Sequence, residues 1–289
     1  MEINSPFRYP GGKFYARKLI MELLPIHDFY IEPFAGGGSV FFAKEKVKEN
    51  WLNDMDTELI NCLSVIQKRP QDLIAALEGE AATKERHKYF KNEYQPRNQL
   101  ERAKRWFYLN RTSYSGIMMM QNCFWGYGDK YSMRPENWPR NILRTSEKLK
   151  GVKLTSLDFE DVIDQAPDGA FLFLDPPYFN ADQDKFYTHS FAKDDHFRLS
   201  DVLRRHADRL TYLITYDNSP EVREIYSWAN HILEKEWNYT ISRTDDQKTK
   251  IKRKGSRSKG REIFILNYGP SYQQAPLFDE AIQYAYSIA

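Results

Sequence analysis

The chain has 289 residues, a length that suits one large domain or a core domain carrying an inserted subdomain. Hydrophobic residues make up 41% and aromatic residues 15% of the sequence, which excludes a wholly disordered chain and supplies material for a core. The formal net charge of +2 excludes a uniformly basic or acidic protein, and the presence of two cysteines excludes a disulfide framework or a multi-cysteine zinc module.

Short apolar runs rich in β-branched and aromatic residues alternate with amphipathic stretches along the chain. Strands are predicted at 29–32, at 153–157, 171–174, 212–216 and 262–268, with a further short strand that ends in 51–56. Helices are predicted at 13–24, 58–67, 194–206 and 220–229. The alternation predicts an α/β fold with a mainly parallel, doubly wound sheet.

Residues 68–150 interrupt this alternation. The segment 80–109 is charged and helical in character, with a break at Pro96, and 112–134 predicts loops and a hairpin. The domain prediction is therefore an inserted, mainly helical subdomain at 68–150 within a core formed by 1–67 and 151–289.

A glycine turn, Pro10-Gly11-Gly12-Lys13, precedes the first predicted helix. Its two glycines let the backbone pass close to a ligand, and Lys13 can place a cation near a carboxylate. The alternative is a plain Pro-Gly turn before a helix. The spacing does not match a Walker loop.

A second glycine-rich loop, Pro33–Ser39, follows the strand predicted at 29–32. Ligands of open α/β sheets sit beyond the carboxyl ends of the strands, beside such turns. The pattern departs from G-x-G-x-x-G, so it disfavours a dinucleotide site. Farther on, Asp54 can accept hydrogen bonds from the ribose hydroxyls of any adenosine-containing cofactor. Its alternative role is the N-cap of the next helix, which Asp56 can also fill.

The tetrad Asp175-Pro176-Pro177-Tyr178 ends a buried strand and is the most specific motif in the sequence. Two prolines fix the backbone and cannot donate to a sheet, so they predict a rigid turn at the strand's carboxyl end. Asp175 and the Pro176 carbonyl then offer two acceptors that match the two hydrogens of an amino group. Tyr178 offers a flat face to a planar heterocycle.

This arrangement favours methyl transfer to an exocyclic amine. The lone pair of adenine's amino nitrogen is delocalised into the ring, so two acceptors that grip both N–H groups help aim it at a sulfonium methyl group. The alternative is a chance proline turn, which the preceding apolar strand and the upstream glycine loop disfavour.

Several motifs occur in an order that resembles the alpha-class, Dam-like DNA adenine-N6 methyltransferases. These motifs are Pro10–Lys13, Glu32–Ser39, Asn53-Asp54, Tyr108–Arg111, Leu157–Phe159, Asp175–Tyr178 and Arg261–Tyr268. The resemblance covers nearly the whole chain. It implies a Rossmann-like S-adenosylmethionine-dependent methyltransferase sheet as the catalytic domain, with 68–150 as the target-recognition subdomain.

The resemblance also assigns site residues. It implies that S-adenosyl-L-methionine is held by Tyr9, Gly12, Lys13, Pro33, Phe34, Ala35, Gly36, Gly37, Gly38, Ser39, Asp54, Met55, Asp158, Phe159 and Asp175. It implies that Asp175, Pro176, Pro177 and Tyr178 are catalytic and grip the target adenine. That adenine must be flipped out of the duplex. Phe179, Phe186 and Tyr187 then line its pocket or pack as ordinary core residues.

The expected DNA contacts lie in two regions of the chain. The insertion supplies Asn110, Arg111, Tyr114 and Tyr127, although Arg111 can also tie the insertion to the sheet. The basic block 248–261 supplies Lys252, Arg253 and Arg257, with a solvated loop as the alternative.

The expected function is a site-specific adenine-N6 methyltransferase acting on double-stranded DNA. Alternatives are an RNA or cytosine-N4 methyltransferase, which Asp175 disfavours, and a catalytically silent DNA-binding relative. Tyr9 and the stretch 115–120 depart from the Dam pattern and leave the target sequence open. We expect no metal and no membrane span, a cytoplasmic bacterial or phage-type enzyme, a monomer or weak dimer, and a cognate restriction endonuclease as partner.

Overall fold

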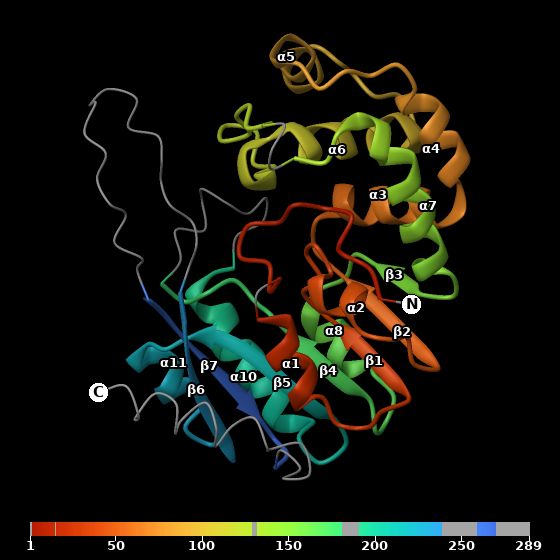
Figure 1. Cartoon of the computed structure of the whole chain (residues 1–289). Coiled ribbons are helices and arrows are strands. Elements are labelled where there is room, and N and C mark those ends of the chain that lie inside the picture. The colour runs from red at the N-terminus through yellow and green to blue at the C-terminus, as the bar shows by residue number, and fades with distance from the viewer. Residues whose placement is uncertain (1, 15, 129–131, 181–190, 239–258, 270–289) are drawn as a thin grey trace, which may run out of the picture.

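The computed structural model describes residues 2–14, 16–128, 132–180, 191–238 and 259–269. Its strands form one sheet in the order β3-β2-β1-β4-β5-β7-β6 (Figure 1). The strands are β1 (Phe29–Glu32), β2 (Glu49–Asn53), β3 (Lys153–Thr155), β4 (Phe171–Leu174), β5 (Thr211–Asp217), β6 (His231–Asn238) and β7 (Lys259–Leu266). Neighbours are parallel, except that β7 is antiparallel to both β5 and β6. The predicted α/β fold with a mainly parallel sheet is confirmed.

Helices occupy the segments between these strands. They are α1 (Arg17–Leu23), α2 (Ser39–Ala43), α3 (Thr57–Lys68), α4 (Pro70–Leu77), α5 (Lys84–Asn92), α6 (Gln99–Thr112), α7 (Trp138–Leu149), α8 (Phe159–Asp164), α10 (Lys193–Arg205) and α11 (Pro220–Ile225). The helices predicted at 58–67 and 194–206 are confirmed as α3 and α10. Within the described ranges, no helix is both long and apolar enough to cross a bilayer.

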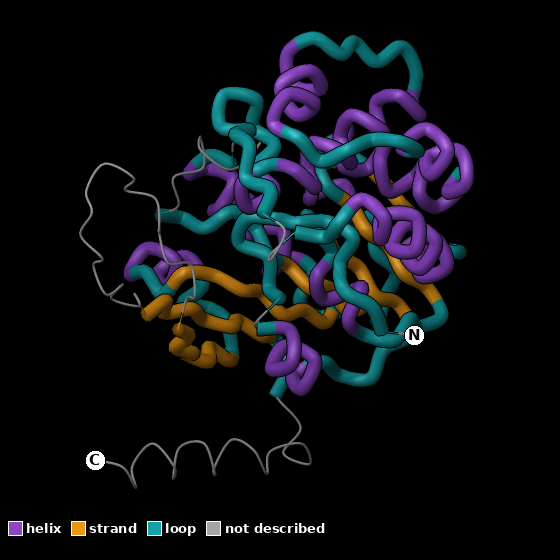
Figure 2. The backbone as a smooth tube through the Cα atoms, turned by 45° about the horizontal axis from the view of Figure 1, so that its top comes forward, coloured by secondary structure: helices purple, strands orange, loops and turns teal. Residues whose placement is uncertain are grey.

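The sheet is covered by helices on both faces (Figure 2). Alternate residues of each strand point to opposite sides, so Tyr30 of β1 joins one apolar cluster and Ile31 joins the other. The first cluster includes residues of α1, α2, α3, α6 and α7, and the second includes residues of α8, α10 and α11. Central strands buried on both faces explain the continuous apolar run of β4.

The segment between β2 and β3 is helical. Its helices α4, α5 and α6 stand together at the top of Figure 1, and α6 packs on α3, α4 and α5. The described part of this segment has one isolated antiparallel bridge, between Ser113 and Trp125. The helix α3, which the domain prediction assigns mostly to the core, packs on both α6 and α7.

The element predictions fail in three places. The helix expected at 13–24 begins only at Arg17, because Gly11 has φ +74° and the Phe14 N–H turns back onto the Gly12 carbonyl. The glycine turn therefore lies before α1 and offers no helix N-terminus. The strand β6 is missing from the predicted elements, since its charged sequence lacks a clear apolar alternation, and the helix expected at 220–229 ends at Ile225.

Candidate active site

The site forms where the strand order of the sheet reverses. Strands β1 and β4 pair in register, with Tyr30 opposite Phe171 and Ile31 opposite Leu172, yet the chain leaves them toward opposite edges of the sheet. A crevice forms outside the carboxyl ends of two such strands. The glycine loop after β1 and the Asp-Pro-Pro turn after β4 both lie at this point of the sheet, and the region between them is called the crevice.

The glycine loop needs its glycines because of backbone conformation and crowding. Gly36 and Gly38 have φ of +47° and +62°, the left-handed region in which a side chain is strained. A Cβ atom on Gly36 would also lie 2.8 Å from Cε1 of Tyr9. The N-terminal segment is thus packed directly onto the loop, with the Tyr9 ring against it.

Glu32, the last residue of β1, stabilises the start of α2, the helix that follows the glycine loop. Its Oε1 accepts hydrogen bonds from the Tyr30 hydroxyl at 2.7 Å and from the Phe41 N–H at 2.9 Å. Burial raises the pKa of Glu32 to about 8, against the lowering effect of these hydrogen bonds and of Lys44. The Gly38 N-cap of α2 carries no side-chain cap, so Glu32 satisfies an N–H group of its first turn.

Asp54 lies beside the glycine loop at the end of β2. Its Oδ2 accepts the Gly36 N–H at 2.8 Å, and its Oδ1 accepts the Asp56 N–H at 2.9 Å. The N-cap of α3 is Asp56, which accepts hydrogen bonds from the N–H groups of Glu58 and Leu59. The alternative interpretation of Asp54 as that N-cap is therefore wrong.

Asn53, fully buried, ties three strand ends together around Asp54. Its side-chain amide donates to the carbonyls of Pro33 and Leu157, each at 3.0 Å, and its Oδ1 accepts the Leu157 N–H. The next side chain along the chain, Met55, is 45% exposed. An apolar surface thus lies open next to the Asp54 carboxylate.

Asp175 is the centre of the crevice. Its Oδ1 lies 2.6 Å from the Lys13 ammonium and accepts a hydrogen bond from the Thr215 hydroxyl at 2.7 Å. The same ammonium lies 4.8 Å from the centre of the Tyr178 ring. Burial raises the pKa of Asp175, Lys13 and Thr215 lower it, and the charge of Glu262 raises it again, with a net upward shift.

The turn after Asp175 is held by residues of β5 and α10. The Phe179 N–H donates to Asp217 Oδ1 at 3.0 Å, and the Phe179 ring packs 5.0 Å from the His196 ring. Tyr178 lies against Tyr216, whose hydroxyl pairs with His196 Nδ1. Burial lowers the pKa of His196 to about 4, so this imidazole is neutral near pH 7.

Asp158 and Phe159 lie at the start of α8 and are braced by Arg198 of α10. The guanidinium of Arg198 bonds both oxygens of Asp158, at 2.7 and 2.9 Å, and its Cζ lies 4.2 Å from the centre of the Phe159 ring. Phe159 is only 3% exposed and packs on Phe34. Burial would raise the pKa of Asp158, but the hydrogen bonds of Arg198 lower it below its usual range.

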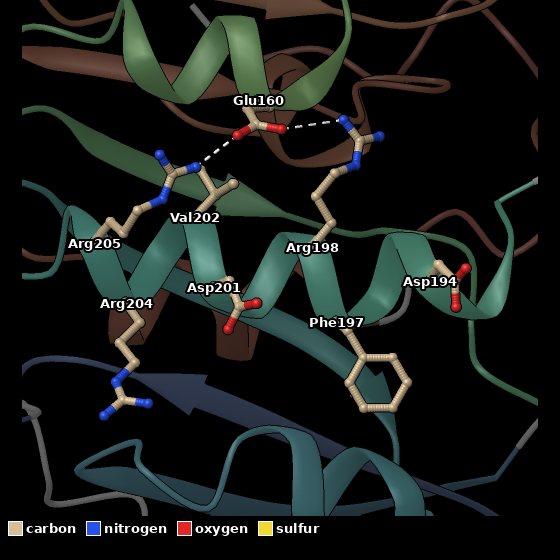
Figure 3. Close-up of a pocket in the computed structure, with 8 residues that line it drawn as sticks. All are labelled: Glu160, Asp194, Phe197, Arg198, Asp201, Val202, Arg204 and Arg205. Atoms are coloured by element: carbon tan, nitrogen blue, oxygen red, sulfur yellow. Dashed lines mark hydrogen bonds and ion pairs between the residues drawn. The ribbon is translucent and has the colours of Figure 1, made fainter.

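A surface pocket of about 980 Å³ lies on the outer side of α10 (Figure 3). Arg198 and Arg205 converge there on Glu160, while the side chains of Phe197 and Asp201 project from α10 away from Glu160 (Figure 3). None of the residues predicted for donor, amine or DNA contact lines this pocket. The pocket is therefore distinct from the Asp175 turn, although Arg198, which lines it, also holds Asp158.

The insertion residues Asn110 and Arg111 lie inside the protein. The Arg8 N–H donates to Asn110 Oδ1 at 3.0 Å, and the Asn110 amide donates to the Arg8 carbonyl at 2.8 Å. Arg111 is 5% exposed and donates to the Pro6 carbonyl, while burial lowers its pKa to about 10. Both side chains tie the N-terminal segment to α6, so the role of Arg111 is structural, but its partner is the N-terminal segment and not the sheet considered in the sequence analysis.

Tyr114 and Tyr127 lie on the loop that follows α6. Tyr114 is 43% exposed, and Tyr127 is partly buried against Trp125. The loop rests on the N-terminal segment, since a Cβ on Gly116 would lie 2.1 Å from the Arg8 carbonyl oxygen. The other predicted residues near DNA or the target base, Lys252, Arg253, Arg257, Phe186 and Tyr187, lie outside the described residues.

Four residues around the crevice have no assigned role in the sequence-based predictions, although Asn53 belongs to the Asn53-Asp54 motif. Thr215, Arg198 and Asn53 act across strands or between helices, so their partners depend on the sheet register and not on any local motif. Arg8 directly precedes Tyr9 and the glycine turn, so its position in the sequence could have identified it as a site residue. Its guanidinium donates to the Ser113 carbonyl at 3.2 Å.

The known proteins that this chain resembles carry methyltransferase or methylase names. The family model of the D12 class N6 adenine-specific DNA methyltransferases matches residues 9–241. That stretch begins at Tyr9 and contains the glycine turn, the glycine loop and the Asp175 turn.

Individual relatives are similar over most of this chain. The Type II methyltransferase M1.LlaDCHI of Lactococcus lactis subsp. cremoris is 28% identical over 283 residues, which cover 91% of this chain and 95% of that protein. The DNA adenine methylase of Escherichia coli (strain K12) is 24% identical over 246 residues, covering 79% of this chain and 86% of that protein. The DNA N-6-adenine-methyltransferase of Escherichia phage P1 is 31% identical over 77% of this chain, but the match spans only 31% of the phage protein.

Proposed function

The chain belongs to the D12 class N6 adenine-specific DNA methyltransferases, and we propose that its methyl donor is S-adenosylmethionine and that its substrate is an adenine flipped from double-stranded DNA. The family match confirms the resemblance drawn from the sequence and the adenine-N6 activity on DNA. The alternatives, an RNA or cytosine-N4 methyltransferase or a silent relative, find no support among these matches.

The residues at the crevice fit such a donor. The loop Gly36–Gly38 turns beyond β1 with positive φ at Gly36 and Gly38, and its glycines let the Tyr9 ring pack directly on the loop backbone. Asp54 is a carboxylate positioned by the Gly36 N–H, and a carboxylate suits the two hydroxyls of a ribose. The exposed Met55 offers an apolar surface to an adenine ring. A nucleoside with a charged amino-acid tail matches this set of groups.

The assignment of donor contacts follows from these positions. Pro33–Ser39 would hold the methionine part, together with Tyr9, Gly12 and Lys13. Asp54 and Met55 would hold the ribose and one face of the adenine. Asp158 would form the far wall of the donor site, and the buried Phe159 ring would support this wall from behind. Arg198 contacts both side chains and holds them in place.

The chemistry at the target amine is derived from the Asp175 turn. S-adenosylmethionine, when bound, supplies an electrophilic methyl group on a sulfonium sulfur. Asp175 and the Pro176 carbonyl would accept the two N–H hydrogens and direct the nitrogen lone pair at that carbon. Attack by this lone pair on the methyl carbon would form a nitrogen–carbon bond as the carbon–sulfur bond breaks with its electron pair going to sulfur, and would leave the nitrogen cationic. The carboxylate of Asp175 stabilises that developing charge.

The extra proton needs no strong base. The methylated amine is an acidic cation, so it can release its proton to Asp175 or to water. Lys13 supports this role, because its ammonium lowers the pKa of Asp175 against the effect of burial. Tyr178 would stack on the flipped ring and hold it in the crevice.

DNA contact is assigned to the surface of the loop after α6 and to the basic block. Tyr114, 43% exposed, would reach the duplex, and Tyr127 would follow it. Lys252, Arg253 and Arg257 would contact phosphates. We also infer a monomer or weak dimer that acts in the cytoplasm of a bacterial or phage-infected cell. A restriction endonuclease with the same target sequence would accompany it, as the Type II name of one relative suggests.

The observation that carries this proposal is the meeting of Lys13, Asp175 and the glycine loop at the sheet's switch point. The test supplies the protein with S-adenosylmethionine and double-stranded DNA of mixed sequence, followed by nucleoside mass spectrometry. N6-methyldeoxyadenosine is the expected product, with much less formed on RNA of the same sequence. N4-methyldeoxycytidine, or no methylated nucleoside in DNA, would overturn it.

A further inference from the structure

Thr215 holds the Asp175 carboxylate from the neighbouring strand. Strand β5 pairs with β4 so that Ile214 lies opposite Leu174, which places the next residue of β5 beside the first residue after β4. Thr215 is fully buried, and its hydroxyl donates to Asp175 Oδ1 at 2.7 Å. The contact to the Leu174 carbonyl is much longer, at 3.5 Å, so the carboxylate is the partner of this hydroxyl.

The two oxygens of Asp175 are not equivalent in this structure. Oδ1 receives both the Lys13 ammonium, at 2.6 Å, and the Thr215 hydroxyl. An ionised carboxylate oxygen has about two acceptor positions, so these donors fill Oδ1. Oδ2 receives no hydrogen bond from the part of the chain that the structure describes, and the Asp175 side chain keeps 20% exposure.

Two donors are needed to fix the plane of this carboxylate. The terminal torsion of an aspartate is broad, so a single cation can pair with either oxygen as the group turns. Lys13 carries its charge on a flexible stem, whereas Thr215 projects from a central strand with a stiff β-branched side chain. The hydroxyl therefore selects which oxygen turns inward.

We propose that Thr215 is a positioning residue of the methyl transfer, which holds Asp175 Oδ1 so that Oδ2 faces the target amine. This inference rests on the proposed role of Asp175. It also explains why a hydroxyl stands at a fully buried strand position, where valine or isoleucine would avoid the cost of burying a polar group.

Two pairs of proteins test the hydroxyl at position 215, because one member of each pair has the hydroxyl and the other lacks it. Thr215→Val replaces the hydroxyl by a methyl group of similar shape, and the wild type is its control. Thr215→Ser keeps the hydroxyl, and Thr215→Ala is the matched variant without it. The second pair keeps the test decisive if Thr215→Val fails to fold.

The measurements are the single-turnover methylation rate across pH, the affinity for S-adenosylmethionine by calorimetry, and the melting temperature. We expect Thr215→Val to methylate about tenfold or more slowly than the wild type, and Thr215→Ala more slowly than Thr215→Ser by a similar factor, because a misplaced acceptor slows the reaction. Donor affinity should stay within about twofold of the wild type in all the variants.

The pH profile separates positioning from mere packing. Lys13, Glu262 and Glu32 also act on Asp175, and they are present in the wild type and in every variant. The hydroxyl lowers the pKa of Asp175, so its loss should move the acid limb of the rate to higher pH in Thr215→Val and Thr215→Ala but not in Thr215→Ser. If Thr215 contributed only packing, the methylation rates would follow the melting temperatures, and the acid limb of the pH profile would not shift.

Equal rates within both pairs, or a loss that tracks melting temperature alone, would overturn the role of Thr215. Asp175→Ala, measured alongside, tells this failure from that of the proposed function. If Asp175→Ala is inactive while position 215 has no effect, Thr215 alone is refuted. If Asp175→Ala methylates normally, the assignment of Asp175 fails, and the inference on Thr215 falls with it.

Discussion

The ammonium of Lys13 lies 2.6 Å from Oδ1 of Asp175, and this ion pair joins the N-terminal glycine turn to the turn after β4. Lys13 is 5% exposed, so water screens the pair only weakly. The cation that the glycine turn is expected to place near a carboxylate is therefore located at the centre of the crevice. It counteracts the upward shift that burial imposes on the pKa of Asp175.

Removing that cation should slow methylation mainly at low pH. In Lys13→Met the pKa of Asp175 should rise further, so a larger fraction is protonated and cannot accept the amine. We expect a loss of about 100-fold in the single-turnover rate at pH 7, partly regained at higher pH. Lys18→Met, at an exposed lysine, is the control. A wild-type pH profile in Lys13→Met would contradict the role of the pair.

Glu32 should make stability fall as the pH rises. Its folded-state pKa, about 8, lies above the ordinary value of 4.5, so the folded protein holds this proton more tightly than the unfolded chain. The stabilising contribution of Glu32 is fully present below about pH 4.5 and is lost as the pH rises toward 8. The total loss in the free energy of unfolding is a few kcal/mol. Denaturant unfolding at pH 5 and pH 8 measures it.

Two substitutions at Glu32 sharpen this prediction. Glu32→Gln keeps an oxygen for the Tyr30 hydroxyl and the Phe41 N–H, so it should stay folded and flatten the pH dependence. Glu32→Ala leaves both donors buried and unpaired, which should cost about 1–3 kcal/mol of stability. The idea fails if Glu32→Gln unfolds with the wild-type pH dependence.

Substitutions at Gly36, in the glycine loop, and at Gly151, outside it, form a matched pair that separates backbone strain from steric crowding. Gly36→Ala and Gly151→Ala both force alanine into the left-handed region, at a cost of about 1–2 kcal/mol each. Only at Gly36 does the new Cβ also meet a ring, that of Tyr9 at 2.8 Å, whereas nothing lies within 4 Å at Gly151. Calorimetry should show weaker S-adenosylmethionine binding in Gly36→Ala alone. Equal donor affinities in the two variants would argue against a donor site at this loop.

Much of the fold can be predicted from the sequence because it depends on local patterns. Apolar runs ending in turn residues locate β1, β4 and β5, and the helical periodicity locates α3 and α10. Asp175 is identified because a strand followed by two prolines is a local signal. By contrast, β6 is a charged strand at the edge of the sheet, and its antiparallel pairing with β7 is set by tertiary contacts.

The parts of the site that the sequence could not supply come from long-range contacts. Thr215 reaches Asp175 only through the register of β4 and β5, and no spacing in the sequence encodes that register. Asn110 has the residue type of a DNA contact, yet the fold buries it against the Arg8 backbone. Residue type indicates what a side chain can bind, whereas packing decides whether it faces the partner.

The basic block should govern the salt dependence of DNA binding. Replacing Lys252, Arg253 and Arg257 by alanine removes three cations, so the slope of log affinity against log salt should become shallower by up to about 0.9 for each phosphate that is no longer neutralised. Fluorescence anisotropy at several salt concentrations gives the slope. The control set replaces three exposed cations outside 68–150 and outside the basic block, Lys18, Lys48 and Arg204. An unchanged slope in the first variant means that the block is a solvated loop.

The most direct measurement of the central claim compares Asp175→Ala with Asp168→Ala, whose side chain is 86% exposed. Single-turnover methylation of double-stranded DNA and calorimetry with S-adenosylmethionine are run on both variants. The account predicts that Asp175→Ala loses N6-methyladenine formation while its donor affinity falls far less, and that Asp168→Ala behaves as the wild type. Methylation by Asp175→Ala at close to the wild-type rate would contradict it.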